Sequence, residues 1–257
     1  MLKKLLFFII FTIALLYSYE LLYARNKATL YGVPKATNFI NTLTNIRRFN
    51  GFIIGYSEFK KNPLWVMYKL KPFSPNLKGN FKRPRGFKID LLTFSMVTHS
   101  DYTKKNYDRG HLAPNYAISR IYGRDAQLDT FFMTNISPQT KSFNRGIWHK
   151  LEKKAVELTN KYGEIWVVTG AIFDDLDIDL EDSFIEIPDS FYKIFIIKIG
   201  GKLHSISFII PQYAKKNEKL SKFIVSIDKI EQLTGFDFFH KLEDRLENNL
   251  ESEIGIL

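Results

Sequence analysis

The stretch Asn106–Pro114, NYDRGHLAP, concentrates more chemistry than any other short segment of the chain. It places Asp108, Arg109 and His111 within four residues, and Gly110 lets the backbone come close to another group. An imidazole, with a pKa of roughly 7, is suited to take a proton from water. We therefore take His111 as the candidate general base. Asp108 either orients His111 or pairs with Arg109, and the sequence leaves both roles open.

A second group of polar residues lies in a predicted helix at residues 144–162, which Gly163 ends. Asn144 and Glu152 are spaced i, i+8 around Trp148, which keeps them near one helix face. A Mg²⁺ ion held by few protein ligands keeps several waters, so an amide ligand and a carboxylate that grips a metal-bound water suit it. The structural alternatives are a helix N-cap for Asn144 and a surface charge for Glu152.

The composition suits one large or two small packed domains, with 257 residues of which 45% are apolar. Because cysteine is absent, disulfides and thiolate metal sites are excluded. Residues 1–90 hold sixteen lysines and arginines and three acidic residues, whereas residues 161–257 hold eleven and eighteen. This uneven distribution of charge has two interpretations. One is a basic face that binds a polyanion, and the other is a solvated lysine-rich surface with no such role. The sequence contains no P-loop, dinucleotide fingerprint, zinc-protease helix or serine-hydrolase elbow.

Hydrophobic patterns along the chain predict one mixed α+β domain after the N-terminal segment. Strands are predicted at residues 52–56, 64–70, 165–170, 191–198 and 202–210, the last two joined about Gly200-Gly201. Further helices are predicted at residues 226–235 and 238–250. The basic segment 82–88, KRPRGFK, lies in an irregular stretch and either follows a phosphate backbone or forms an ordinary exposed loop.

The N-terminus carries an export signal. Lys3 and Lys4 precede the apolar run Leu5–Tyr19, which is typical of a secretory signal peptide. No clean cleavage site follows, so an uncleaved, tilted membrane anchor that ends near Tyr23 is the alternative. We expect residues 1–24 to form this signal or anchor and residues 25–257 to form the catalytic domain.

Three motifs occur in a fixed order: DRGHLAP at 108–114, NISPQ at 135–139, and NRGIW at 144–148 followed by Leu151-Glu152. Together they resemble the DNA/RNA non-specific endonucleases, the family of the secreted sugar-non-specific bacterial nucleases and endonuclease G. The resemblance covers about Tyr31 to Leu250. It includes YGVP at 31–34, WVVTG at 166–170 and IDKIEQLTGFDFF at 227–239.

The resemblance implies a ββα-metal nuclease fold, in which a mainly antiparallel central sheet is flanked by helices. It implies that His111 is the general base, that Asn144 is the direct Mg²⁺ ligand, and that Glu152 holds a metal-bound water. The other roles that it implies are a stabilising cation at Arg109, an upstream phosphate clamp at Arg85, and supporting polar residues at Asp108, Asn135 and Gln139. Residues 115–118, NYAI, depart from the family pattern and bear on cleft width and substrate preference.

The function expected from these features is Mg²⁺-dependent endonuclease activity on DNA and RNA through backbone contacts, with Mn²⁺ or another divalent cation as a substitute. The alternatives are a catalytically inactive nucleic-acid-binding protein and a phosphodiesterase that acts on small nucleotides. We expect an exported protein, periplasmic or secreted, or anchored to the inner membrane by its N-terminal segment. Relatives are often dimers, so the chain is also a candidate to form a homodimer.

Overall fold

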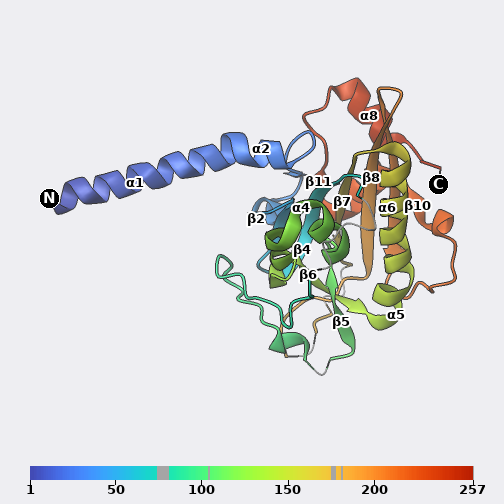
Figure 1. Cartoon of the computed structure of the whole chain (residues 1–257), viewed down its shortest axis with the longest axis horizontal. Helices are drawn as coiled ribbons and strands as arrows, with labels where there is room; N and C mark the ends of the chain where they lie inside the picture. Colours follow the sequence, from blue (N-terminus) through green and yellow to red (C-terminus); the bar gives the residue numbers. More distant parts are fainter. Residues whose placement is uncertain (74–80, 104, 175–177, 181, 257) are drawn as a thin grey trace.

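The computed structural model describes residues 1–256 apart from 74–80, 104, 175–177 and 181, and its centre is a seven-stranded antiparallel sheet (Figure 1). The strand order is β10-β9-β8-β7-β4-β3-β2. The strands are β2 (Asn45–Phe49), β3 (Phe52–Ser57), β4 (Asn62–Leu70), β7 (Ile165–Ile172), β8 (Ser190–Ile199), β9 (Lys202–Pro211) and β10 (Ile224–Val225). The predicted α+β fold with a mainly antiparallel sheet is therefore confirmed.

Two short sheets flank the central one. β1 (Lys35–Ala36) pairs with β11 (Phe236–Asp237), and β5 (Tyr107–His111) pairs with β6 (Ile136–Thr140), both antiparallel. The remaining elements are helical. They are α1 (Leu2–Tyr19), η1 (Glu20–Ala24), α2 (Arg25–Ala28), α3 (Phe39–Thr42), η2 (Ser100–Tyr102), α4 (Asn115–Asp129), η3 (Met133–Asn135), α5 (Lys141–Phe143), η4 (Asn144–Trp148), α6 (His149–Tyr162), η5 (Leu220–Phe223), α7 (Ile227–Thr234) and α8 (Asp244–Ser252).

Both faces of the central sheet are buried, which explains why its inner strands are apolar along their whole length. In β8, Phe191 and Phe195 point to a core layer that includes Leu151 of α6. The alternate residues of β8, such as Tyr192 and Ile194, point to a second layer completed by α7 and the segment before α8. The sheet therefore separates the β5–β6–α6 side of the molecule from the α7–α8 side.

Turn and cap residues account for several of the predicted boundaries. Gly200 (φ 57°) and Gly201 (φ 85°) form the predicted hairpin turn between β8 and β9. Ser226 caps α7 by accepting a hydrogen bond from the Lys229 amide at 3.2 Å. Gly235 (φ 68°) ends α7 in the left-handed conformation. The predicted helix at 226–235 is thus confirmed.

The predicted helix at 238–250 was wrong in its first half, because α8 begins only at Asp244. Phe238 and Phe239 are fully buried in the second core layer, and Phe239 has a positive φ of 56°, which no helix accommodates. The predicted helix at 144–162 in fact begins with α5 at Lys141. The sequence patterns also missed α4, whose path is broken at Gly123 (φ 89°).

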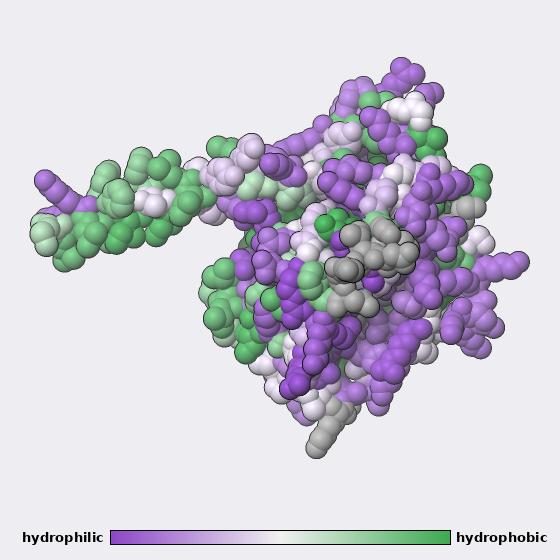
Figure 2. Space-filling model, viewed as in Figure 1, coloured by the Kyte–Doolittle hydropathy of each residue, from purple (hydrophilic) through white to green (hydrophobic). Residues whose placement is uncertain are grey.

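The N-terminal helix projects from the domain as an apolar rod (Figures 1 and 2). α1 has no buried residue, and the continuous helical stretch Leu2–Ala28 has a mean hydropathy of 2.2 in its most apolar window. A signal sequence and a membrane anchor both have this character.

Candidate active site

A ββα unit built from β5, β6 and the helical stretch α5–η4–α6 carries most of the predicted site residues. β5 and β6 pair with Asp108 opposite Gln139 and His111 opposite Ile136. The helix follows β6 directly, so its first turn lies beside the middle of β5. Figure 1 shows β5, β6 and α5 together at one end of the molecule.

Gly110 makes the close approach that the sequence suggested, and the group it meets is Gln139. A Cβ atom at position 110 would lie 2.2 Å from Cδ of Gln139. Gln139 is fully buried, and within the described part of the chain neither atom of its amide has a hydrogen-bond partner. An unpaired buried amide costs free energy, which is typical of groups that serve a ligand or ordered water.

His111 lies between two aromatic rings. Its ring centroid is 5.5 Å from that of Phe87 and 5.0 Å from that of Phe131. Burial, together with the nearby charge of Arg83, lowers the pKa of His111 to about 3, against a hydrogen bond to the backbone of Arg109 that raises it. Nε2 is buried and has no partner among the described residues, so the bond to Arg109 comes from Nδ1. The ring is therefore neutral, with the lone pair of Nε2 free to accept a proton.

Asp108 acts on Arg109 only through its charge, and its hydrogen bonds go to two other residues, Asn144 and Arg145. Its carboxylate accepts two hydrogen bonds from Arg145, at 2.8 and 2.7 Å, and one from Nδ2 of Asn144 at 3.0 Å. Burial opposes ionisation, but the bonds from Arg145 and Asn144 outweigh it and lower the pKa of Asp108. Because Nδ2 of Asn144 is held by Asp108, the amide oxygen Oδ1 is directed away from this carboxylate, where it can bind a cation.

Arg109 is held by the segment around η2. Its Nη2 donates to the His99 carbonyl at 2.7 Å and to Oγ1 of Thr103 at 3.0 Å. The guanidinium also lies 5.9 Å from the Phe87 ring and 5.8 Å from the Tyr102 ring. Arg109 and His111 therefore contact the same aromatic ring, that of Phe87.

Asn135 fixes the backbone that follows His111. Its Oδ1 accepts from the Ala113 amide at 2.8 Å, and its Nδ2 donates to the carbonyls of Ala113 and Thr130 at 3.1 and 3.0 Å. The side chain is fully buried, so these bonds are shielded from water. Asn135 thus holds the turn out of β5 by hydrogen bonds to the backbone.

The helix bearing Asn144 and Glu152 starts with a π-helical turn, η4, and Gly146 within it leaves helical geometry (φ −106°, ψ −107°). In a regular α-helix, residues eight apart are about 80° out of phase. The irregular turn at Gly146 therefore means that the angle between Asn144 and Glu152 differs from that of the regular α-helix predicted from the sequence.

Glu152 is half-buried and lies 3.6 Å from Nδ1 of His149. Its charge also acts on Lys193 of β8, a residue that the sequence interpretation missed. Lys193 is fully buried, and its Nζ lies 4.2 Å from the Trp148 ring with no hydrogen-bond partner among the described residues. Burial lowers the pKa of Lys193 to about 8, while Glu152 raises it. A lysine inside the otherwise apolar run 191–197 was the available signal.

The basic segment 82–88 reaches the site through a different arginine from the one expected. Arg85 is exposed on this segment, whereas the guanidinium of Arg83 lies 5.1 Å from the Phe131 ring, and its charge acts on His111. Phe87 from the same segment contacts His111. The sequence marks Arg83 only as one of several cations in the basic segment 82–88, and nothing local distinguishes it from Arg85.

The fold and this arrangement define a class of protein: a ββα nuclease with a neutral histidine on β5 and an asparagine at the start of the following helix. The model of the DNA/RNA non-specific endonuclease family matches residues 34–245, and the chain belongs to that family. Its members are metal-dependent nucleases, and this chain is a nucleic-acid-hydrolysing enzyme. The family predicted from the ordered motifs is therefore confirmed.

Individual relatives agree with this assignment. The chain is 28% identical to mitochondrial endonuclease G of Homo sapiens over 224 residues, which cover 81% of this chain and 71% of the relative. It is 29% identical to a nuclease of Nostoc sp. over 217 residues, which cover 80% and 77%. The crystal structure of the EndoG/EndoGI complex contains a chain with a TM-score of 0.72 and 24% identity, covering 84% of this chain and 91% of that one, which supports the fold.

Proposed function

We propose that the protein is an endonuclease that cuts DNA and RNA with little sequence preference, with His111 as general base and Mg²⁺ bound at Asn144. The observation that carries the proposal is the buried Nε2 of His111, which has no partner among the described residues. A neutral imidazole nitrogen with a free lone pair is what a base needs in order to remove a proton from water. Its fixed neighbours Phe87 and Phe131 hold the ring in one place.

The donor set at the start of the helix fits a hard divalent cation. Oxygen ligands suit Mg²⁺, and a single amide ligand leaves room for the waters that Mg²⁺ retains. In this proposal the amide oxygen of Asn144 binds the ion, and Glu152 holds one of the ion's waters. The ion, when bound, neutralises charge that develops on the phosphate and the leaving oxygen. Mn²⁺ has similar ligand preferences and is expected to substitute.

The protein's own cations complete the proposed site. Arg109 is held by the His99 carbonyl and by Phe87, the ring that His111 also contacts, and is suited to contact the scissile phosphate. Arg83 and Arg85 are exposed on the basic segment 82–88, where contacts to the backbone phosphates would provide affinity without reading sequence. Gln139, with its unpaired amide behind Gly110, is suited to hold an ordered water near the base.

The test is digestion of plasmid DNA and of RNA by the full-length protein with Mg²⁺, with EDTA, and with two histidine variants. We expect His111→Ala to abolish most cutting and His204→Ala to leave it unchanged, since His204 pairs with Glu253. Undiminished cutting by His111→Ala would refute the assigned base. Tight binding without turnover in any divalent metal would instead favour an inactive nucleic-acid-binding protein, and faster turnover of a dinucleotide than of long duplex would favour a small-nucleotide phosphodiesterase.

We further propose that the protein is exported and that its N-terminal helix stays attached as a membrane anchor. Glu20 accepts from Nη2 of Arg48 on β2 at 2.9 Å and lies 3.7 Å from Arg25. The Leu30 amide contacts Sδ of Met67 at 3.1 Å, and Ala24 is buried. Cleavage near Ala24 would remove Glu20 from its partners, which favours an intact helix. Mass spectrometry of the purified N-terminus tests this, and a mature chain that starts near Arg25 would show a cleaved signal peptide.

A further inference from the structure

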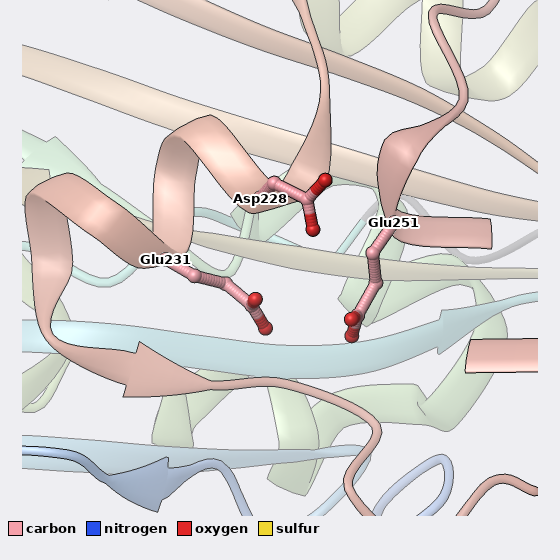
Figure 3. Close-up of side chains that lie close together, drawn as sticks. All are labelled: Asp228, Glu231 and Glu251. Atoms are coloured by element: carbon pink, nitrogen blue, oxygen red, sulfur yellow. The ribbon is translucent and has the colours of Figure 1, made fainter. Parts of the chain in front are cut away.

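Helices α7 and α8 bring carboxylates together on the side of the sheet opposite the nuclease site. Asp228 and Glu231 lie one turn apart on α7, and Glu251 comes from α8 (Figure 3). One carboxylate oxygen from each of the three residues lies within 4.8 Å of the others. Asp228 is exposed, Glu231 is half-buried and Glu251 is buried, so the cluster has an open end and a closed end.

The closed end contains an unpaired carboxyl group. The Glu251 residue is only 6% exposed, and its Oε1 is inaccessible and has no hydrogen-bond partner in the part of the chain that the structure describes. Figure 3 shows its carboxylate directed toward that of Glu231. Oε1 of Glu247, one turn earlier on α8, is also buried without a described partner. Buried charges in proteins are paired or coordinate metals, so this arrangement calls for a positive group.

Side chains around the cluster supply little of that charge. Lys35 pairs with Asp237 at 3.8 Å, and its charge and that of His240 act on Glu247. Lys229 of α7 donates to Gln232 instead. Glu231 accepts a hydrogen bond from the Phe238 amide at 2.6 Å, which fixes its position without neutralising it. Burial, together with the neighbouring acids, raises the pKa of Glu251 to about 9, as expected where a counter-charge is lacking.

We propose that Asp228, Glu231 and Glu251 bind a Ca²⁺ ion that ties α8 to α7. Three oxygens no more than 4.8 Å apart can all lie within about 2.8 Å of one central point. Ca²⁺ takes oxygen ligands at roughly 2.3–2.6 Å in flexible geometry, so a small inward movement completes the site. Mg²⁺ demands about 2.0–2.1 Å and strict octahedral geometry, which makes it the poorer fit. The exposed Asp228 gives the ion its route of entry.

The experiment uses the full-length Asn144→Ala protein, stripped with EDTA, so that the proposed nuclease metal does not contribute. Calcium chloride alone is titrated in by calorimetry, and thermal unfolding is followed in parallel. We expect one Ca²⁺ to bind and the Tm to rise by several degrees. When Glu251→Gln is added to this protein, we expect its Ca²⁺ affinity to fall at least tenfold. The control is Asp244→Asn, which changes an exposed acid on the same helix and is expected to leave the Ca²⁺ affinity unchanged.

Two results would overturn the proposal. The first is the absence of Ca²⁺ binding in the Asn144→Ala protein, which would mean that protons alone hold these carboxylates together. The second is Ca²⁺ binding that Glu251→Gln leaves unchanged. Glu251→Gln keeps the shape of the side chain, so the variant is expected to fold, and its Tm without Ca²⁺ provides the check. Nuclease activity plays no part in any of these measurements.

Discussion

The carboxylate of Asp108 on β5 accepts a 3.0 Å hydrogen bond from the side-chain amide of Asn144, at the start of the helix that completes the ββα unit. The two residues are 36 positions apart in the chain. The same carboxylate holds Arg145 through two further hydrogen bonds. This contact determines which end of the Asn144 amide is free, and it therefore links the hairpin that carries His111 to the proposed metal ligand.

Removal of this contact is expected to weaken the proposed metal site. In Asp108→Asn the side chain no longer carries the charge that pairs with Arg145, and the Asn144 amide can turn. Loss of a supporting partner of a metal ligand typically costs about 10–100-fold in metal affinity or activity. We expect the Mg²⁺ concentration for half-maximal cutting to rise about tenfold or more. Asp125→Asn, an exposed acid on α4, is the control, and equal Mg²⁺ dependence in both variants would contradict the role of Asp108.

Gly110 is expected to tolerate no side chain. The added methyl of Gly110→Ala would collide with Gln139, where the separation would be only 2.2 Å. Overpacking of a buried site typically costs about 1–3 kcal/mol. The free energy of unfolding, measured by urea denaturation, should fall by about this amount, and cutting should fall with it. In the matched control Gly86→Ala, a Cβ would meet nothing within 4 Å, so that variant should behave like the parent.

Arg83 and Arg85 offer a comparison between two exposed cations of the same loop. Arg83 lies over Phe131 and acts on His111, so its removal changes the charge next to the candidate base. We expect Arg83→Ala to lower kcat/KM by more than tenfold and Arg85→Ala to lower it less, through weaker substrate binding alone. Steady-state cutting of a duplex substrate at one fixed ionic strength distinguishes them. A larger loss of kcat/KM in Arg85→Ala than in Arg83→Ala would support Arg85 as the phosphate clamp that was expected from the sequence.

The pH dependence follows from the lowered pKa of His111, about 3 in the folded protein. The ring stays neutral down to about pH 4, so kcat/KM should show no loss attributable to this base between pH 8 and 5. The unfolded state binds the proton at its ordinary pKa of about 6.5. This contribution to stability is therefore complete above pH 6.5 and is lost as the pH falls toward 3. A base-dependent decline in rate centred near pH 6.5 would contradict the neutral ring.

Replacement of Lys193 is expected to affect the Tm and the nuclease activity in different ways. Its ammonium is buried without a hydrogen bond from any described residue, so Lys193→Met removes an uncompensated charge and should leave the Tm unchanged or raise it. Cutting should fall, because the positive charge that acts on Glu152 is lost. Lys198→Met, at an exposed position on the same strand, is expected to change neither quantity. A Lys193→Met protein with full activity would show that the lysine has no bearing on Glu152.

The ordered motifs alone were enough to predict the family and the α+β fold. Local signals carry such information well. Ser226 and Gly235 bound α7 as capping rules predict, and the two glycines at 200 and 201 turn the β8–β9 hairpin. These features depend on residues within a few positions of one another. The same local patterns failed at 238–243, because burial of Phe238 and Phe239 against the sheet overrides helical spacing.

Tertiary structure alone decided which residues meet. The pairing of Asp108 with Arg145 spans 37 positions and depends on β6 returning alongside β5. The position of Arg83 beside His111, and of Lys193 beneath Trp148, also arises from packing between separate elements. Charges attract and repel through space, and no local periodicity encodes such distances. The sequence of NYDRGHLAP therefore supplies the candidate base, His111, whereas the fold determines its neighbours and its proton affinity.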